Sequence, residues 1–304
     1  MTIGTQILAA QYVTIQNKAQ SLIGTGSATL GYGQTVQSSD VFTGNAITKA
    51  QWDALRFDIL NIRLHQDGVL PNAVVIAVGD PINFGAGAPN TNYNTLLETA
   101  SANRFRIDAS QSVVSAKTSG TYTTAWSNSI TATLTLTFSN SDEARYFFNS
   151  GGKARFTTTL TGGSGSQQYN SWVNVLNSVG TQSFGADTDA IVNYYTLTNS
   201  FQTYFLRTLS TPYSANTFRL EARTDVANNN TGTATQLFLR ITLTDPYVDP
   251  ATSPDTPSTI LPIDQVDGTL TISVSELKAA GNLQPSGTFS ITSPTYSLSA
   301  ISGS

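Results

Sequence analysis

The sequence predicts an α+β fold dominated by β-strands, with an N-terminal helical region followed by an antiparallel sheet or sandwich that carries short helical insertions. Apolar side chains in the first hundred residues recur at the three- and four-residue spacing of helices. From about Arg104 onward, apolar residues alternate with threonine and serine, which is the period of half-buried strands. We therefore expect two regions, residues 1–103 for docking or oligomerisation and the β-rich residues 104–304.

Helices are expected in the first region at residues 9–23, from Thr48, and at residues 94–103. Thr48 and Gln51 have the spacing of a capping box, and Gly68 is placed to end the second helix. The first two helices each carry an apolar stripe, which we expect to pack against the other stripe or against a neighbouring subunit. The candidate docking residues on these stripes are Tyr12, Ile15, Leu22, Trp52, Leu55 and Ile59.

Alternation predicts the strands of the second region, and a further helix interrupts them at residues 167–179 before Gly180. The Pro-rich residues 245–264 are interpreted as an extended linker or an excursion at a sheet edge. The C-terminal residues 297–304 either dock along a sheet edge or stay free. The expected strands lie near residues 104–108, 112–118, 130–138, 154–161, 181–185, 194–197, 203–209, 217–224, 235–243, 268–278 and 289–291.

The most distinctive segment is residues 139–156, where a strand breaks into a short helix and then returns to strand. Asn140 and Glu143 have the spacing of a helix N-terminus, and the aromatic residues that follow can lie on a sheet. The two glycines after them tolerate the positive φ that ends many helices. We single out as the structural motif Tyr146, Phe147, Phe148, Gly151, Gly152 and Phe156.

Residues that carry catalytic or metal chemistry are sparse in this chain. His65 is the only histidine, and its place near a helix end favours a capping or hydrogen-bonding role, where a cation suits the helix dipole. Asp245, Asp249 and Asp255 lack the regular spacing of a calcium loop and are interpreted as solvated acids. The chain has no cysteine, and its acids show no paired spacing typical of a glycosidase. We expect no enzymatic activity, no cofactor and no metal site.

Composition limits the partners. The net charge is −4 with no basic run, so nucleic-acid binding is not expected, and no apolar stretch is long enough for a membrane helix. Charged residues make up only 11% of the chain, and a surface of neutral hydroxyls and amides suits a particle-borne, oligomeric protein. Four tyrosines are candidates either for sugar contacts or for sheet packing, and we favour packing: Tyr194, Tyr195, Tyr204 and Tyr213.

Residues 144–156 resemble an ARYFFNSGG-x-x-RF signature in virion structural proteins of tailed bacteriophages, of the tail-fibre, neck or tail-associated type. Residues 47–59, 172–180 and 266–281 fit the same pattern. The resemblance implies a non-enzymatic component of the phage tail, neck or baseplate, located in the virion and bound to other virion proteins. The alternative is a receptor- or carbohydrate-binding adhesin, or a depolymerase, at a fibre tip in contact with a host-surface glycan.

Overall fold

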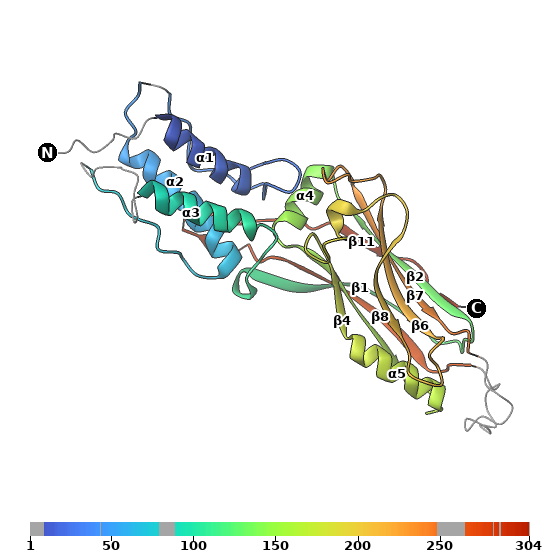
Figure 1. Cartoon of the computed structure of the whole chain (residues 1–304). Helices are drawn as coiled ribbons and strands as arrows, with labels where there is room; N and C mark the ends of the chain where they lie inside the picture. The colour runs from blue at the N-terminus through green and yellow to red at the C-terminus, as the bar shows by residue number, and fades with distance from the viewer. Residues whose placement is uncertain are drawn as a thin grey trace.

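The computed structural model of the chain describes residues 9–42, 44–78, 89–247, 265–281, 283–285 and 287–303. The molecule is elongated, with three helices at one end and two antiparallel sheets at the other (Figure 1). The predicted α+β fold dominated by strands is confirmed, because the N-terminal helices precede a β-rich region.

Three helices form a layer at one end of the molecule: α1 (Ala9–Ile23), α2 (Lys49–Asp67) and α3 (Pro89–Ala102). The bounds of α1 and both predicted ends of α2 are confirmed. The Thr48 side chain accepts a hydrogen bond from the Gln51 amide in a capping box, and Gly68 ends the helix with a left-handed φ of 72°. These caps satisfy backbone groups that have no partner within the helix.

Helix α3 is longer than the prediction of residues 94–103. It begins at Pro89, a residue type that is favoured in the first turn of a helix because its φ is already helical. The additional residues bring Tyr93 into the interior of the layer, where its ring lies 5.6 Å from the ring of Trp52. Tyr93 therefore belongs to the helical core, which the sequence pattern did not indicate.

The first sheet has antiparallel strands in the order β1 (Ser112–Tyr122), β8 (Thr269–Ala279), β3 (Lys153–Thr161) and β4 (Thr181–Phe184). A 3-10 turn, η1 (Ala109–Gln111), leads into β1. Because β1 and β3 both pair with β8, this sheet needs the C-terminal part of the chain to hold its strands together.

The second sheet is also antiparallel. Its short strand β12 (Ser302–Gly303) pairs with β2 (Ser129–Thr137), beside β11 (Thr295–Leu298). A two-stranded hairpin, β9 (Leu283–Gln284) and β10 (Gly287–Thr288), precedes β11 in the chain. The C-terminal residues thus dock along a sheet edge, which confirms the first of the two predicted alternatives. The strands of this sheet are, in order, β11 (Thr295–Leu298), β2 (Ser129–Thr137), β7 (Gln236–Thr244), β6 (Thr217–Thr224) and β5 (Gln202–Thr208), with β12 (Ser302–Gly303) beside them.

The two sheets face each other as a sandwich. On one side β1 lies near β11, and on the other the ring of Phe184 in β4 lies 4.8 Å from the ring of Tyr204 in β5. Every second residue of β2 is buried between the sheets, as the alternation predicts. Helix α5 (Gln167–Val179) packs on β3 and reaches β5, and its Trp172 ring lies 5.2 Å from that of Trp126.

Three predicted strands are wrong. Residues 104–105 belong to a turn and residues 106–108 have no regular structure. Residues 289–291 form an irregular connection in which Phe289 and Ile291 are nevertheless buried. Residues 194–197 contain a 3-10 helix, η2 (Tyr194–Thr196), because the Asn193 side chain caps it by accepting from the Tyr195 amide. Aromatic and β-branched residues favour strands in general, but here tertiary packing decides their conformation.

Asp245, the first residue of the Pro-rich segment, is buried, whereas residues 248–264 lie outside the described residues. Asp245 accepts hydrogen bonds from Trp172 Nε1 at 3.0 Å and from Gln168 Nε2 at 2.8 Å. The prediction of a solvated acid is therefore wrong for Asp245, and burial raises the pKa of its carboxyl to about 6. The other two acids of that stretch, Asp249 and Asp255, lie outside the described residues.

Candidate functional site

The residues predicted to dock on a partner are inside the helical layer. The edge of the Tyr12 ring meets the Trp52 ring at 5.1 Å, and the Tyr12 hydroxyl donates to the Gln51 carbonyl. These side chains form the layer's own core, so they are not available to another subunit, and this prediction is corrected. The buried set is Tyr12, Ile15, Leu22, Trp52, Leu55 and Ile59.

Exposed apolar side chains at this end lie instead on the segment after α2, residues 69–78, together with Phe42. Residues 70–77 have no regular secondary structure, and the carbonyl of Ala73 accepts from Arg56 Nε at 3.0 Å. Ala73 and Ile76 are buried against the helices. Val75 is 63% exposed and Val78 is 86% exposed. The segment is thus anchored through some residues while others face outward.

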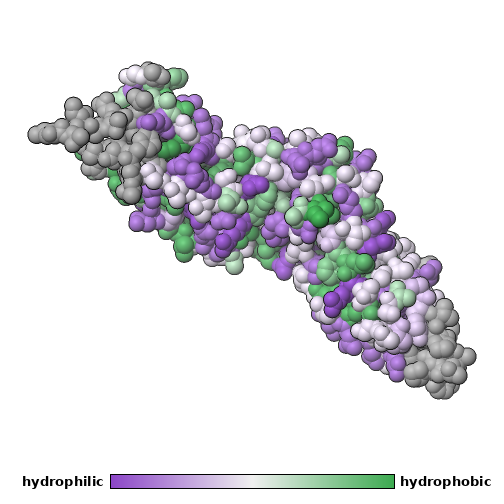
Figure 2. All heavy atoms as spheres, in the orientation of Figure 1, coloured by the Kyte–Doolittle hydropathy of each residue, from purple (hydrophilic) through white to green (hydrophobic). Residues whose placement is uncertain are grey.

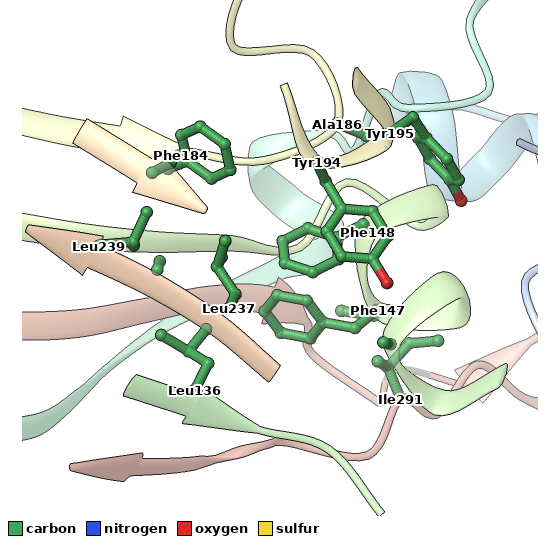
Figure 3. Close-up of a cluster of buried hydrophobic side chains, with 14 of the residues drawn as sticks. Leu136, Phe147, Phe148, Phe184, Ala186, Tyr194, Tyr195, Leu237, Leu239 and Ile291 are labelled. Atoms are coloured by element: carbon green, nitrogen blue, oxygen red, sulfur yellow. The ribbon is translucent and has the colours of Figure 1, made fainter. Parts of the chain in front are cut away.

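The motif helix α4 (Ser141–Asn149) lies between the helical layer and the sandwich (Figure 1). Its Phe147 and Phe148 are fully buried, with their rings 5.0 Å apart, and Phe148 stacks on Tyr194 at 4.0 Å (Figure 3). Phe156 is buried on β3. Such pairs contribute more than their buried area alone. The predicted packing of these aromatic residues into the β-rich core is confirmed.

Tyr146 differs from its neighbours because it faces the helical layer. A Cβ atom added at Gly33 would lie 2.4 Å from the Tyr146 ring, and Gly33 has a φ of 66°. The ring therefore needs a glycine opposite it, in the loop that follows α1. The prediction that Tyr146 shares the sheet-facing side of its helix is wrong.

The two motif glycines serve different purposes. Gly151 has a φ of 83°, as predicted for a residue that follows a helix end. Gly152 does not have a positive φ, and a Cβ atom there would lie 2.5 Å from the Phe147 carbonyl oxygen. Gly152 is therefore required by the close approach of the backbone, which corrects the prediction of positive φ at both positions.

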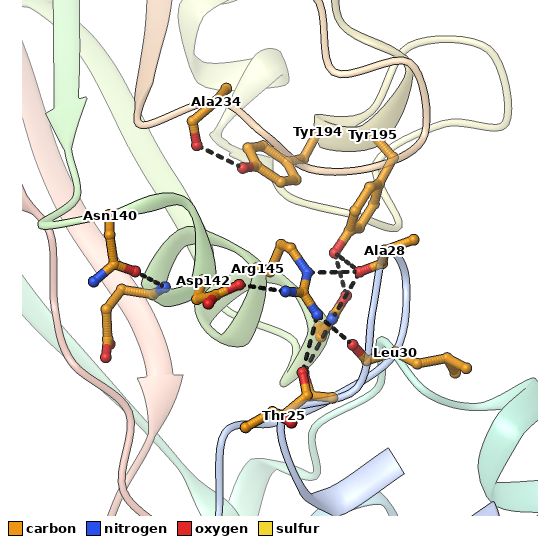
Figure 4. Close-up of polar contacts among 12 residues, drawn as sticks. Thr25, Ala28, Leu30, Asn140, Asp142, Arg145, Tyr194, Tyr195 and Ala234 are labelled. Carbon is orange, nitrogen blue, oxygen red and sulfur yellow. Dashed lines mark hydrogen bonds and ion pairs between the residues drawn. The ribbon is translucent and has the colours of Figure 1, made fainter. Parts of the chain in front are cut away.

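The polar side of α4 fixes the loop after α1 (Figure 4). Arg145 pairs with Asp142 and donates to the carbonyls of Thr25 at 3.0 Å, Ala28 at 3.2 Å and Leu30 at 3.1 Å. Charge-assisted hydrogen bonds of this kind are stronger than neutral ones. One guanidinium therefore satisfies three backbone carbonyls that lie more than a hundred residues earlier in the chain.

Asn149 adds to the contact that Arg145 makes with the loop after α1. The sequence pattern did not single out either residue for this role. Its Nδ2 donates to the Gly31 carbonyl at 3.0 Å, and its Oδ1 accepts from the Tyr195 hydroxyl. The same hydroxyl oxygen lies 3.0 Å from the Ala28 carbonyl oxygen, so its single proton is shared between the two acceptors. The available signal was the four-residue spacing of Arg145 and Asn149, which places them on one face of a helix.

His65 joins α2 to the end of α4. Its Nε2 donates to the Ser150 carbonyl at 2.9 Å, and its ring stacks on Phe289 at 4.0 Å. Burial lowers the pKa of the ring to about 4. The predicted hydrogen-bonding role is confirmed, but the ring is neutral at pH 7 because it is buried, so the expected cation at a helix end is wrong.

Other buried charges have structural partners. The Asp58 carboxylate accepts from the Ser38 hydroxyl at 2.6 Å and from two backbone amides, although burial raises its pKa. Glu276 in β8 is fully buried and pairs with Lys117, which lies at a bulge in β1, at 3.0 Å. Within the described ranges, no three His, Cys, Asp or Glu side chains are grouped so that they could hold a metal ion.

A surface groove of about 470 Å³ lies between α5 and the loop after β5. One wall carries Asn170, Asn174 and Ser178, and the other carries Arg207 and Tyr213. The residues that line this groove include no carboxylate, so it lacks the acid pair that a glycosidase needs.

The described helices include none that is both long and apolar enough to cross a membrane. The site that the structure does bring together is the junction around α4, where the motif joins the helical layer to the sandwich. Comparison of the chain with models of protein families, with curated proteins and with solved structures gives no match.

Proposed function

We propose that this protein is a non-enzymatic structural component of a tailed-phage virion that docks on other virion proteins through its helical end. The resemblance of residues 144–156 to the virion signature supports the particle and the region of the tail or neck. The exposed apolar residues of segment 69–78 carry the docking part, because exposed apolar surface is typical of interaction sites. The proposed partners are other virion subunits and further copies of this chain.

The junction around α4 supports a structural role that uses both ends of the molecule. Arg145, Asn149 and His65 connect the helical layer to the sandwich through hydrogen bonds to backbone carbonyls. The helical layer is therefore held directly against the sandwich, so a partner bound at the helical end is also connected to the sheets. Such rigidity suits a subunit that connects two parts of a particle.

The surface supports a docking area of limited size. On the face drawn in Figure 2, hydrophobic residues form small separate patches among hydrophilic ones. Small apolar patches favour assembly with partners that also contribute polar contacts. This matches a chain in which only 11% of residues are charged and hydroxyls and amides are abundant.

The proposal is tested by replacing Val75 and Val78 with serine and measuring the copy number of the protein on purified particles. Both side chains are exposed, so the variant folds, and we expect its incorporation to fall several-fold. The matched control is Ile191→Ser in the β-rich region, where the side chain is 78% exposed. Unchanged incorporation of the double variant, or an equal loss with Ile191→Ser, contradicts docking through this segment.

Point substitutions are the appropriate test because removal of the helical layer damages the remainder. A chain that lacks residues 1–103 no longer has the backbone carbonyls that Arg145 and Asn149 bind. The truncation also uncovers the ring of Phe289, which is buried against Tyr32 and His65. Loss of assembly by such a truncated chain therefore does not distinguish lost docking from lost folding.

A further inference from the structure

The outer face of the second sheet carries a cluster of arginines that the fold does not require for its core. Strand register places Arg240 opposite Glu221 and Phe238 opposite Arg223, with Thr242 opposite Arg219. The alternate residues of these strands point into the sandwich and are buried, so the clustered residues lie on the opposite face. We call this the arginine face, and it consists of Phe201, Arg219, Glu221, Arg223, Phe238 and Arg240.

The arginine face has more positive than negative charge. Arg240 Nε lies 2.8 Å from Glu221 Oε2, and Arg219 Nε lies 3.6 Å from the same oxygen. Arg223 has no carboxylate partner among the described residues. The carboxylate of Asp225, which follows β6, accepts a hydrogen bond from the Thr235 hydroxyl and does not pair with Arg223. The face thus carries three guanidinium groups and one carboxylate, which two of them share, in a chain whose net charge is −4.

Aromatic rings hold two of the three guanidinium groups in place, those of Arg223 and Arg240. Arg223 lies over the Phe238 ring at 3.9 Å and over Phe201 at 5.1 Å, and Arg240 lies over Phe201 at 4.0 Å. The side chains remain accessible, since Arg219 is 40% exposed and Arg240 is 33% exposed. A stacked guanidinium keeps its N–H edge available and loses little conformational entropy when it binds an anion.

Hydroxyl groups continue the face on the next strand. Thr131, Thr133 and Thr135 of β2 lie opposite Thr242, Arg240 and Phe238 of β7. Arg219 and Arg223 are separated by four residues of extended strand, which is about 13 Å at ~3.3 Å per residue. The face therefore offers cationic groups at intervals, with hydroxyls beside them, along a surface that suits an extended polymer.

We propose that the arginine face binds an acidic polysaccharide, with guanidinium groups on the carboxylates of the sugar and threonine hydroxyls on its hydroxyl groups. Arg pairs with carboxylates through two parallel hydrogen bonds, which gives the geometry needed for recognition. A single-stranded nucleic acid is disfavoured because guanidinium groups already cover the aromatic rings of this face, which leaves no ring for bases to stack on. This binding goes beyond the proposed docking function and uses a different part of the molecule.

The test measures binding of the full chain to polygalacturonate by calorimetry at low ionic strength, with neutral dextran and polyglutamate as comparison polymers. We expect binding to polygalacturonate that weakens with added salt, weaker binding to polyglutamate, and none to dextran. Dextran bound as tightly as polygalacturonate overturns the role of charge. Polyglutamate bound as tightly overturns the role of the sugar, and no binding to polygalacturonate overturns the proposal.

Substitutions locate the binding on this face. Arg223→Gln is expected to weaken binding to polygalacturonate about tenfold, since it removes a charge-assisted contact. Arg223→Lys keeps the charge without the planar fork and is expected to weaken it less. The matched control is Arg155→Gln, at an outward position of β3 on the other sheet. Circular dichroism checks that each variant is folded, and an equal loss with Arg155→Gln overturns the location.

A second pair of substitutions isolates the hydroxyl groups. The double variant Thr133→Val and Thr135→Val keeps the shape and charge of the face and removes two hydroxyls from it. We expect weaker binding to polygalacturonate and unchanged binding to polyglutamate. An equal effect on both polymers overturns the proposed contact between threonine and sugar.

Discussion

Two sets of arginines in this molecule have opposite surroundings. Each of the three guanidinium nitrogens of Arg145 donates to a group of the chain itself, either a backbone carbonyl or Asp142. On the arginine face, Arg219 and Arg240 lie near one carboxylate and Arg223 and Arg240 lie over phenylalanine rings. The side chains of Arg219 and Arg240 stay partly in solvent. A cation whose donors are occupied by the chain stabilises the fold, whereas a cation held in place with free donors is available to a ligand.

The largest change in the free energy of unfolding is expected at Arg145. Arg145→Ala removes a charge-assisted donor from three partly buried carbonyls, of which only that of Ala28 keeps another donor among the described residues, so we expect the free energy of unfolding in urea to fall by about 3–5 kcal/mol. Arg223→Gln is expected to lower it by less than about 1 kcal/mol, since stacking at an exposed site contributes little. Equal losses at the two positions break the distinction between the two sets.

A second prediction concerns two buried groups that titrate in opposite directions. The folded-state pKa of Asp245 is raised to about 6, so its contribution to stability is present below pH 4 and is lost as the pH rises through 6. The folded-state pKa of His65 is lowered to about 4, so its contribution is present above pH 6.5 and is lost as the pH falls through 4. The two contributions offset each other between pH 4 and 6.5.

Single variants separate these contributions. With Asp245→Asn, we expect the free energy of unfolding to fall more steeply than in the wild type as the pH goes from 6.5 to 4, by on the order of 2 kcal/mol. With His65→Gln, which keeps a donor for the Ser150 carbonyl, we expect the opposite change over the same range. Urea unfolding at a series of pH values checks both, and parallel curves for all three proteins contradict the assigned pKa directions.

The smallest difference between a variant and its matched control is expected at glycines, where the same contrast between junction and surface applies to the backbone. Gly151 has a φ of 83°, and a Cβ atom there would lie 2.8 Å from Ile107. Gly165 has a φ of 80° and open space around it, so it provides the control for strain alone. We expect Gly151→Val to lower the free energy of unfolding by about 2–3 kcal/mol and Gly165→Val by about 1 kcal/mol. Calorimetric melting checks this, and equal shifts in Tm contradict a role for the contact with Ile107.

Local features of the fold were predictable from the sequence because they depend on neighbouring residues. The capping box at Thr48, the left-handed Gly68 and the alternation in β2 each follow from short-range chemistry. The stripes of α1 and α2 were also recognised, but their partner was not, since a pattern of apolar residues does not say whether it packs within the chain or against another. Tyr194 was assigned to a strand because its ring favours sheets in general.

The junction and the arginine face depend on residues far apart in the sequence. Arg145 meets carbonyls of residues 25–30, and no local signal reports that distance. Arg219, Arg223 and Arg240 come together only when β6 and β7 take their register. Because the basic residues are scattered singly along the sequence, no basic cluster was predicted. The hairpin of β6 and β7 nevertheless places three arginines on one face of the sheet.

The pairing of distant segments has a consequence for the order in which this chain folds during its synthesis. Strand β8 separates β1 from β3 in the first sheet, and the Gln34 side chain donates to the Ser290 carbonyl and accepts from the Ser290 amide. Neither contact can form until the ribosome has synthesised β8 and residue 290, respectively. Contacts between residues so distant slow folding, because the loop between them must close first. We therefore expect the nascent chain to keep the edges of β1 and β3 unpaired until β8 emerges from the ribosome, long after β1 has been synthesised.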